Sequence, residues 1–326
     1  MMKVAKIGLL LMAGLVAARA APPLPSMYWA DESRGRPFSK DPSVIRFGER
    51  ALMYYSIPPF GDKRSNDGWA IGIAESRDLE HWTKIGELLP AQECDRQGLC
   101  APGAWVHDGR VHLFYQTYGN GPKDAICHAW SDDGVHFTRE PTNPVFSPHG
   151  AWTVGRAIDA EVVPLGDRLL LFFATRDPAM KVQMIGVAAA PLASDYARGQ
   201  WRQLVDAPVL KPELPWERNC IEAPTIVRRG DTLWMFYAGG YNNEPQQIGA
   251  ASSSDGLTWT RASVQPLLPN GAPDAWNASE SGHPGSFADR DGRTWLFYQG
   301  NRDKGKTWYL SRVEIDWSSD VPAVKR

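Results

Sequence analysis

The sequence predicts an all-β fold: a five-bladed β-propeller with about four antiparallel strands per blade. The main observation is an apolar, aromatic segment that recurs five times, anchored on Tyr55, Tyr115, Phe173, Tyr237 and Tyr298. These positions are separated by 60, 58, 64 and 61 residues. A glycine-containing polar turn precedes every copy, and the chain after the N-terminus shows no helical periodicity. A constant period with several strands per copy is typical of propellers.

Each copy contains the same series of elements. In the first copy, PSVIRF at 42–47 is followed by the turn F-G-E-R and by ALMYYS at 51–56. An apolar segment, a glycine turn and a second apolar segment predict a β-hairpin. A third segment, IGIAES at 71–76, leads through a turn toward an aromatic residue and a predicted outer strand. The alternative, a two-sheet sandwich, does not explain five evenly spaced copies.

The first twenty residues read as a signal peptide. Lys3 and Lys6 precede an apolar run at 7–16, and Ala18-Arg19-Ala20 is a small-x-small cleavage pattern. We therefore expect residues 21–326 to form a single exported domain, secreted or periplasmic, with no membrane contact after cleavage. The alternative is an uncleaved anchor, for which the apolar run is short, because a membrane span needs about 20 residues.

The composition excludes some partners and favours others. A net charge of -2 without a basic stripe argues against nucleic acid. The chain has 14 Trp, whose rings either stack on sugars or fill the core. Trp residues in loop-like segments are the candidates for sugar platforms: Trp69, Trp152, Trp216 and Trp276. The oligomeric state stays open.

Four cysteines in an exported chain permit disulfides. Cys94 and Cys100 flank a short polar loop, so a local bridge between them is expected. Cys127 and Cys220 lie in predicted strands, and their pairing stays open.

Carboxylates occupy the starts of several predicted inner strands, which line the central channel of a propeller. Counting back fourteen residues from each aromatic anchor leads to Asp41, Ala101, Asp159, Ala223 and Pro284. One position earlier lie Lys40, Cys100, Ile158, Glu222 and His283. Asp41, Asp159 and Glu222 are therefore expected to converge on one mouth of the channel. The alternative for each acid is a turn cap or a pair with Lys40 or Arg156.

Three facing carboxylates suit the hydrolysis of a glycosidic bond. The leaving alkoxide needs a proton from a carboxylic acid, and the attacking water needs an ionised carboxylate. A third carboxylate beside the acid raises the pKa of that acid by like-charge repulsion.

Four short motifs in this order resemble glycoside hydrolase family 43 and its five-bladed relatives. They are D-P-S-V-I at 41–45, I-D-A at 158–160, I-E-A-P at 221–224 and G-H-P-G at 282–285. The resemblance implies an inverting hydrolase, with Asp41 as general base, Asp159 as pKa modulator and Glu222 as general acid. An inverting mechanism implies that the acid and base carboxyls lie about 6.5–9.5 Å apart. It also implies that His283 lies near the channel axis and helps to hold a structural calcium ion, through water, although no cofactor is required.

Three further residues, together with His283, are predicted to bind the oligosaccharide or polysaccharide substrate. Trp105 lies on the second inner strand, where it either borders the sugar subsite or packs in the core. Arg156 lies three residues before Asp159, where it binds a sugar or neutralises the acids. Arg302 follows the last aromatic strand, where it reaches the pocket or stays at the surface.

Substrate specificity is the least constrained prediction. An α-L-arabinofuranosidase or a β-xylosidase is favoured, and other furanosidases and anhydrogalactosidases remain alternatives. The segments I-D-A and E-A-P differ from the more frequent I-D-P and E-G-P of the family, so no substrate is carried over. The alternative mechanisms are a retaining invertase-like enzyme, a phosphorylase, and a carbohydrate-binding propeller without catalysis.

Overall fold

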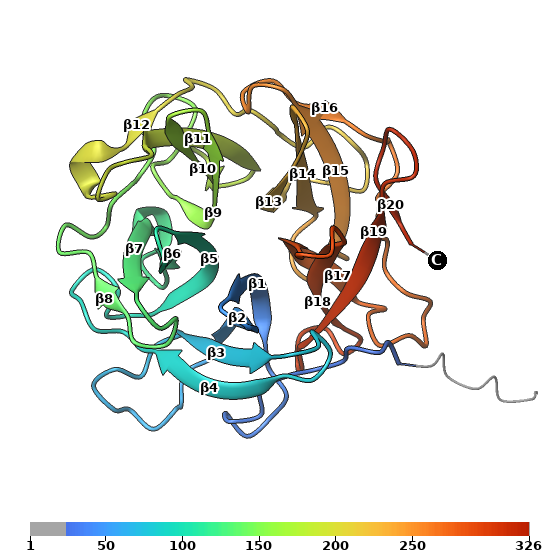
Figure 1. The fold of residues 1–326 in the computed structure, drawn as a ribbon, viewed down its shortest axis with the longest axis horizontal. Helices are drawn as coiled ribbons and strands as arrows, with labels where there is room; N and C mark the ends of the chain where they lie inside the picture. The colour runs from blue at the N-terminus through green and yellow to red at the C-terminus, as the bar shows by residue number, and fades with distance from the viewer. Residues whose placement is uncertain (1–23, 326) are drawn as a thin grey trace, which may run out of the picture.

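The computed structural model describes residues 24–325 and contains five four-stranded antiparallel sheets around a central channel (Figure 1). The predicted five-bladed propeller is confirmed. The predicted signal peptide lies outside the described residues. Within residues 24–325, none of the helices is long and apolar enough to cross a membrane.

Four consecutive strands make each blade, with the first strand innermost. Blade one contains β1 (Lys40–Phe47), β2 (Arg50–Ile57), β3 (Ala70–Ser76) and β4 (Thr83–Leu88). Blade two contains β5 (Leu99–His107), β6 (Arg110–Thr117), β7 (Ile126–Ser131) and β8 (Thr138–Arg139). Blade three contains β9 (Ile158–Leu165), β10 (Arg168–Arg176), β11 (Gln183–Pro191) and β12 (Arg202–Gln203).

Blade four contains β13 (Ile221–Arg229), β14 (Thr232–Gly239), β15 (Gln247–Ser253) and β16 (Thr260–Arg261). Blade five contains β17 (Glu280–Ala288), β18 (Thr294–Asn301), β19 (Tyr309–Asp316) and β20 (Ala323–Val324). Two short 3₁₀ helices, η1 (Gly121–Lys123) and η2 (Arg198–Gln200), lie in connecting segments.

The hydrophobic core consists of clusters between neighbouring blades. The aromatic anchors of the repeat lie on the second strands, where all five are less than 5% exposed. On the channel side, the inner strands approach closely: a Cβ on Gly103 would lie 2.0 Å from the Ala160 carbonyl oxygen. A Cβ on Gly285 would lie equally close to the Pro42 oxygen. These glycines therefore allow blade two to contact blade three and blade five to contact blade one.

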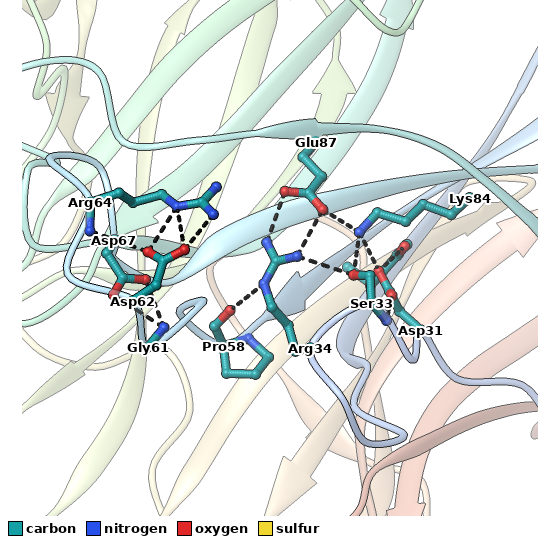
Figure 2. A network of polar contacts seen from close by, with 11 residues as sticks. Asp31, Ser33, Arg34, Pro58, Gly61, Asp62, Arg64, Asp67, Lys84 and Glu87 are labelled. Atoms are coloured by element: carbon teal, nitrogen blue, oxygen red, sulfur yellow. Dashed lines mark hydrogen bonds and ion pairs between the residues drawn. The ribbon is translucent and has the colours of Figure 1, made fainter.

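The segment before β1 joins the first and last blades. The backbones of Trp29 and Leu310 exchange two hydrogen bonds of 2.8 and 3.1 Å, which attach this segment to β19. On blade one, Lys84 of β4 contacts Asp31 at 2.8 Å, and Arg34 pairs with Glu87 at 2.8 Å (Figure 2). Backbone pairing on one side and partly buried ion pairs on the other connect the first and last blades.

The predicted disulfide between Cys94 and Cys100 is wrong for this structure. All four cysteines are free thiols, and the Cys94 Sγ lies 3.9 Å from the Cys127 Sγ. The loop between β4 and β5 turns Cys94 toward the third strand of blade two, a contact that sequence spacing could not reveal.

A pair of stacked histidines lies in the core between blades two and three. The Nδ1 of His112 is 3.0 Å from the Nε2 of His128, and the His128 ring also stacks on Phe114. His128 is 1% exposed. Burial lowers the pKa of His128 to about 3 and that of His112 to about 4. Both rings are therefore neutral in the folded protein at neutral pH.

These depressed pKa values predict acid lability. In the unfolded chain both histidines bind protons near pH 6.5, whereas in the folded protein they do so only near pH 4 and pH 3. The stability that the neutral rings contribute is therefore complete above pH 6.5 and is lost as the pH falls toward the folded pKa values. At pH 5 we expect His128 alone to reduce the free energy of unfolding by about 2 kcal/mol. His128→Phe should lose correspondingly less stability than wild type between pH 7 and 5 in urea titrations. Identical losses would contradict this role.

Candidate active site

The five inner strands begin with the same backbone irregularity. Each contains a β-bulge and a non-glycine residue with positive φ, at Asp41, Ala101, Asp159, Ala223 and His283. A bulge redirects a side chain, and it recurs at equivalent places around the channel. Asp41, Asp159 and His283 occupy this position, and Glu222 directly precedes it. The three predicted carboxylates are thus brought to one mouth of the channel.

The structure corrects the predicted alignment of blade five. His283, and not Pro284, is equivalent to Asp41 and Asp159. Gly285 pairs with Phe297, twelve residues later, whereas Ser43 pairs with Tyr54, eleven residues later. The hairpin of blade five thus has one extra residue, so counting back fourteen from Tyr298 stops one residue short of His283.

Side chains from neighbouring blades hold most of the bulges in place. The backbone N–H groups of four bulge residues donate to a side-chain oxygen of the preceding blade at 2.8–3.1 Å. The four pairs are Asp41 with Gln299, Ala101 with Ser56, Asp159 with Gln116, and His283 with Gln246. The functional side chains are therefore positioned by contacts between blades.

His283 lies between two carboxylates. Its Nε2 is 3.3 Å from the Asp159 Oδ1 and 3.4 Å from the Asp41 Oδ1. Burial opposes protonation of the ring, but Asp41 and Asp159 outweigh it and raise the pKa of His283 to about 9. At neutral pH an imidazolium thus connects the predicted base with the predicted modulator.

Asp41 is held in its ionised form. Burial opposes the charge, but His283 and Lys40 outweigh burial and keep the pKa of Asp41 below its usual value. The Lys40 Nζ is 3.8 Å from the Asp41 Oδ1 and lies 4.7 Å from the centroid of the Trp308 ring. An ionised carboxylate is what a general base requires.

Glu222, in contrast, is favoured in its protonated form. Burial, followed by the negative charge of Asp159, raises the pKa of Glu222 above its ordinary value. Its Oε1 accepts a hydrogen bond of 2.7 Å from Gln246, and its Oε2 contacts the amide of Gln183. A buried carboxyl beside another carboxylate keeps its proton longer, as a general acid requires.

A second ring of residues escaped the sequence prediction. Each aromatic anchor on a second strand pairs with one residue of the third strand. Three residues before that partner, the five blades carry Trp69, Asp124, Gln183, Gln246 and Trp308. Gln183 and Gln246 contact Glu222, and Trp308 lies under Lys40. Counting along the third segment of each repeat would have identified this ring.

Arg156 is connected to the site through this ring. Its Nε is 3.5 Å from the Asp124 Oδ2, and its Nη1 donates to the Gln183 Oε1 at 3.3 Å. Arg176 donates to the same oxygen at 2.8 Å. Because Gln183 contacts Glu222, Arg156 lies one side chain away from the predicted acid.

Two predicted substrate-binding residues lie elsewhere. Trp105 stacks on His107 at 4.5 Å and packs against the core between blades two and three. Arg302 lines a pocket of about 390 Å³ on blade five with Tyr28, Trp276 and Tyr309. Neither the pocket nor the core cluster contains one of the three carboxylates, and substrate binding by these two residues stays a prediction.

Most candidate tryptophan platforms are structural. Trp152 packs against Gly186, Trp216 against Gly239 and Gly249, and Trp276 against Gly300. Trp69 differs from them, because it contacts Phe38 and the 38% exposed Tyr118, at 5.6 and 5.4 Å between ring centroids. Phe38 also contacts Trp308, the ring that lies under Lys40, and this contact links the aromatic pair to the lysine beside the base.

The residues around His283 do not fit a directly bound calcium ion. Within residues 24–325, no three His, Cys, Asp or Glu side chains are placed to hold a metal ion. The Nε2 of His283 faces two carboxylates at 3.3 and 3.4 Å, and a calcium ion held by His283 through water stays a prediction. The imidazolium itself supplies positive charge between these acids.

The model of the glycosyl hydrolases family 43 matches residues 35–320. The chain belongs to this family. It is therefore a glycoside hydrolase. The resemblance inferred from the four short motifs is confirmed.

Solved structures similar to this family 43 chain share its fold. A thermostable family-43 glycoside hydrolase has a TM-score of 0.71 and 19% identity, over 94% of this chain and 96% of that one. An endo-1,4-beta-xylanase from Bacteroides thetaiotaomicron has a TM-score of 0.67 and 20% identity, over 88% and 94%. An alpha-L-arabinofuranosidase from Lactobacillus brevis has a TM-score of 0.67 and 17% identity, over 91% and 94%. At these identities the likeness concerns the fold alone.

Proposed function

We propose that this family 43 enzyme hydrolyses glycosidic bonds with inversion, using Asp41 as general base, Asp159 as modulator and Glu222 as general acid. The main support for the proposal is that the pKa values of two buried carboxyls at one mouth of the channel are shifted in opposite directions. His283 and Lys40 favour the ionised form of Asp41, whereas burial and Asp159 favour the protonated form of Glu222. One group is thus prepared to accept a proton and the other to donate one.

In the proposed reaction, Glu222 transfers its proton to the oxygen of the leaving sugar as the glycosidic bond breaks. Asp41 removes a proton from a water molecule that attacks the anomeric carbon from the opposite face. Asp159 keeps the pKa of Glu222 high, and His283 positions Asp41 and Asp159 relative to each other. Gln183 and Gln246 orient the carboxyl of Glu222.

We propose saccharides with α-L-arabinofuranosyl or β-xylosyl residues as substrates. Xylan-acting and arabinose-releasing enzymes are among the similar structures, and Trp69 with Tyr118 offers aromatic surface near the base. We also propose export to the periplasm or the medium, on the basis of residues 1–20. Mass spectrometry of protein secreted by an expression host should then identify Ala21 as the first residue.

Proton NMR of the first product tests the mechanism directly. Aryl arabinofuranosides and xylosides are hydrolysed in the spectrometer, and the anomeric signal is read before mutarotation. Inversion is the expected result for the active substrate. A product with the configuration of its substrate would instead assign Asp41 as a nucleophile in a retaining mechanism.

The pH profile separates the modulator from the base and the acid. At low pH, activity should fall as Asp41 gains a proton, at a pH below the ordinary pKa of an aspartate. At high pH, activity should fall as Glu222 loses its proton, at a pH above the ordinary pKa of a glutamate. Asp159→Asn removes the like charge, so the pKa of Glu222 falls and the alkaline limb of kcat/KM moves down by about one pH unit. An unchanged alkaline limb would remove Asp159 from the modulator role.

A further inference from the structure

A pair of cysteines lies at the border between the β4–β5 loop and blade two. The Cys94 Sγ is 3.9 Å from the Cys127 Sγ, whereas a disulfide has a sulfur–sulfur distance of about 2.0 Å. Cys94 belongs to the loop between β4 and β5, so closing this distance requires a movement of its side chain and of the loop, and not of a strand. Cys127 is fully buried in β7, which provides a rigid partner.

The two thiols differ in reactivity. Cys94 is half-buried, and the hydrogen bond with Cys127 lowers the pKa of the Cys94 thiol. The same contact, together with burial, raises the pKa of Cys127 well above its ordinary value. Since the thiolate is the nucleophile, Cys94 is the attacking group and Cys127 the resolving group.

The other two cysteines are poor candidates for oxidation. Burial, followed by the charge of Asp41, raises the pKa of Cys100 well above its ordinary value. Burial, followed by the charge of Glu222, does the same for Cys220. Both are fully buried, and a buried thiol with a raised pKa is inert.

We propose that Cys94 and Cys127 are a specific disulfide-forming pair that fastens the β4–β5 loop to blade two in an oxidising environment. With oxidised glutathione as oxidant, the Cys94 thiolate attacks one sulfur of the glutathione disulfide and releases one glutathione thiol. The Cys127 sulfur then attacks the Cys94 sulfur of the mixed disulfide and releases the second. The two cysteines lose two electrons and two protons, and the glutathione disulfide gains them.

The disulfide would stabilise one wall of the site. The β4–β5 loop ends at Gly98, whose carbonyl oxygen accepts a hydrogen bond of 2.8 Å from the N–H of Tyr118. Leu99, the next residue, donates to the carbonyl oxygen of Trp69 at 3.0 Å. The loop with Cys94 therefore supports the backbone of both aromatic residues near the base. This proposal is independent of the substrate and of the catalytic roles.

The test uses the full mature protein. It is equilibrated with reduced or oxidised glutathione, its remaining thiols are alkylated, and its peptides are mapped by mass spectrometry without reduction. The expected result is a Cys94–Cys127 crosslinked peptide in the oxidised sample, with Cys100 and Cys220 alkylated after unfolding. A crosslink between Cys94 and Cys100, or four alkylated thiols in the oxidised sample, would overturn the proposal.

Thermal unfolding provides the second measurement. Because a disulfide restricts the unfolded chain, the oxidised protein should melt about 5 °C above the reduced protein. Cys94→Ser is the matched control, since it keeps the size of the side chain and removes the attacking sulfur. Its melting temperature should not respond to glutathione. An equal response in Cys94→Ser would show that the effect arises elsewhere in the chain.

Discussion

Glu222→Gln is expected to lower kcat for substrates with poor leaving groups by about 10²–10⁴-fold, the usual contribution of a general acid. The amide has almost the shape of the carboxyl but has no proton to transfer to the departing oxygen. Gln183 and Gln246 both donate to Glu222, so the variant keeps one of these hydrogen bonds and sets its new NH2 group against the other donor. The change is confined to this pair of side chains, so the backbone of the mouth should keep its form. The loss therefore concerns proton transfer and not substrate binding.

The measurement compares aryl glycosides that differ in the acidity of the leaving phenol. An acidic phenol departs without a proton, so Glu222→Gln should retain much more activity on it than on a weakly acidic one. KM should change little on either substrate. Equal losses on both substrates would assign Glu222 to binding or positioning. Urea titration of the variant checks that its fold is intact.

Asp41→Gly is expected to lower kcat by a similar factor, about 10²–10⁴-fold, because the attacking water loses its base. Asp41 has a φ of 56°, a conformation that glycine adopts without strain. The variant should therefore keep the bulge, with Gln299 still accepting the hydrogen bond of the backbone N–H. It also leaves an empty space beside Lys40 and His283, two cations.

That space suggests a rescue experiment with azide, a small anionic nucleophile. Azide should restore turnover of Asp41→Gly and form a glycosyl azide of inverted configuration. Asp41→Asn is the control, because it also lacks the base but keeps the space filled, so azide should not rescue it. Rescue of both variants, or of neither while Asp41→Gly remains folded, would argue against a base at this position.

The propeller and the three acids were predictable because both follow from periodicity. Buried aromatic residues recur at the same point of each second strand, and the inner strand starts at a nearly constant distance before it. That distance identified Asp41 and Asp159 as equivalent residues. It failed by one residue at His283, because the length of the β17–β18 hairpin depends on its turn.

The contacts between blades could not be predicted from the sequence repeat, because the repeat describes each blade separately. Gln183 holds Glu222, and Gln299 holds Asp41, each from a neighbouring blade. Trp105 and Arg302 lie at plausible distances from the acids along the chain, yet one packs between blades and the other lines a separate pocket. Distance along the chain places a residue on a strand, but the face that it occupies depends on the bulges and on the adjacent blade.

Local patterns of apolar, turn and acidic residues thus predicted the order of strands, the number of blades and the convergence of three carboxylates. They did not predict the charge state of those carboxylates. The charge state depends on burial and on the placement of His283 between Asp41 and Asp159. These two aspartates lie 118 residues apart in the sequence (159 − 41), and the folded ring of blades brings both of them to His283. Electrostatic interactions act through space, so only the folded ring of blades determines which acid keeps its proton.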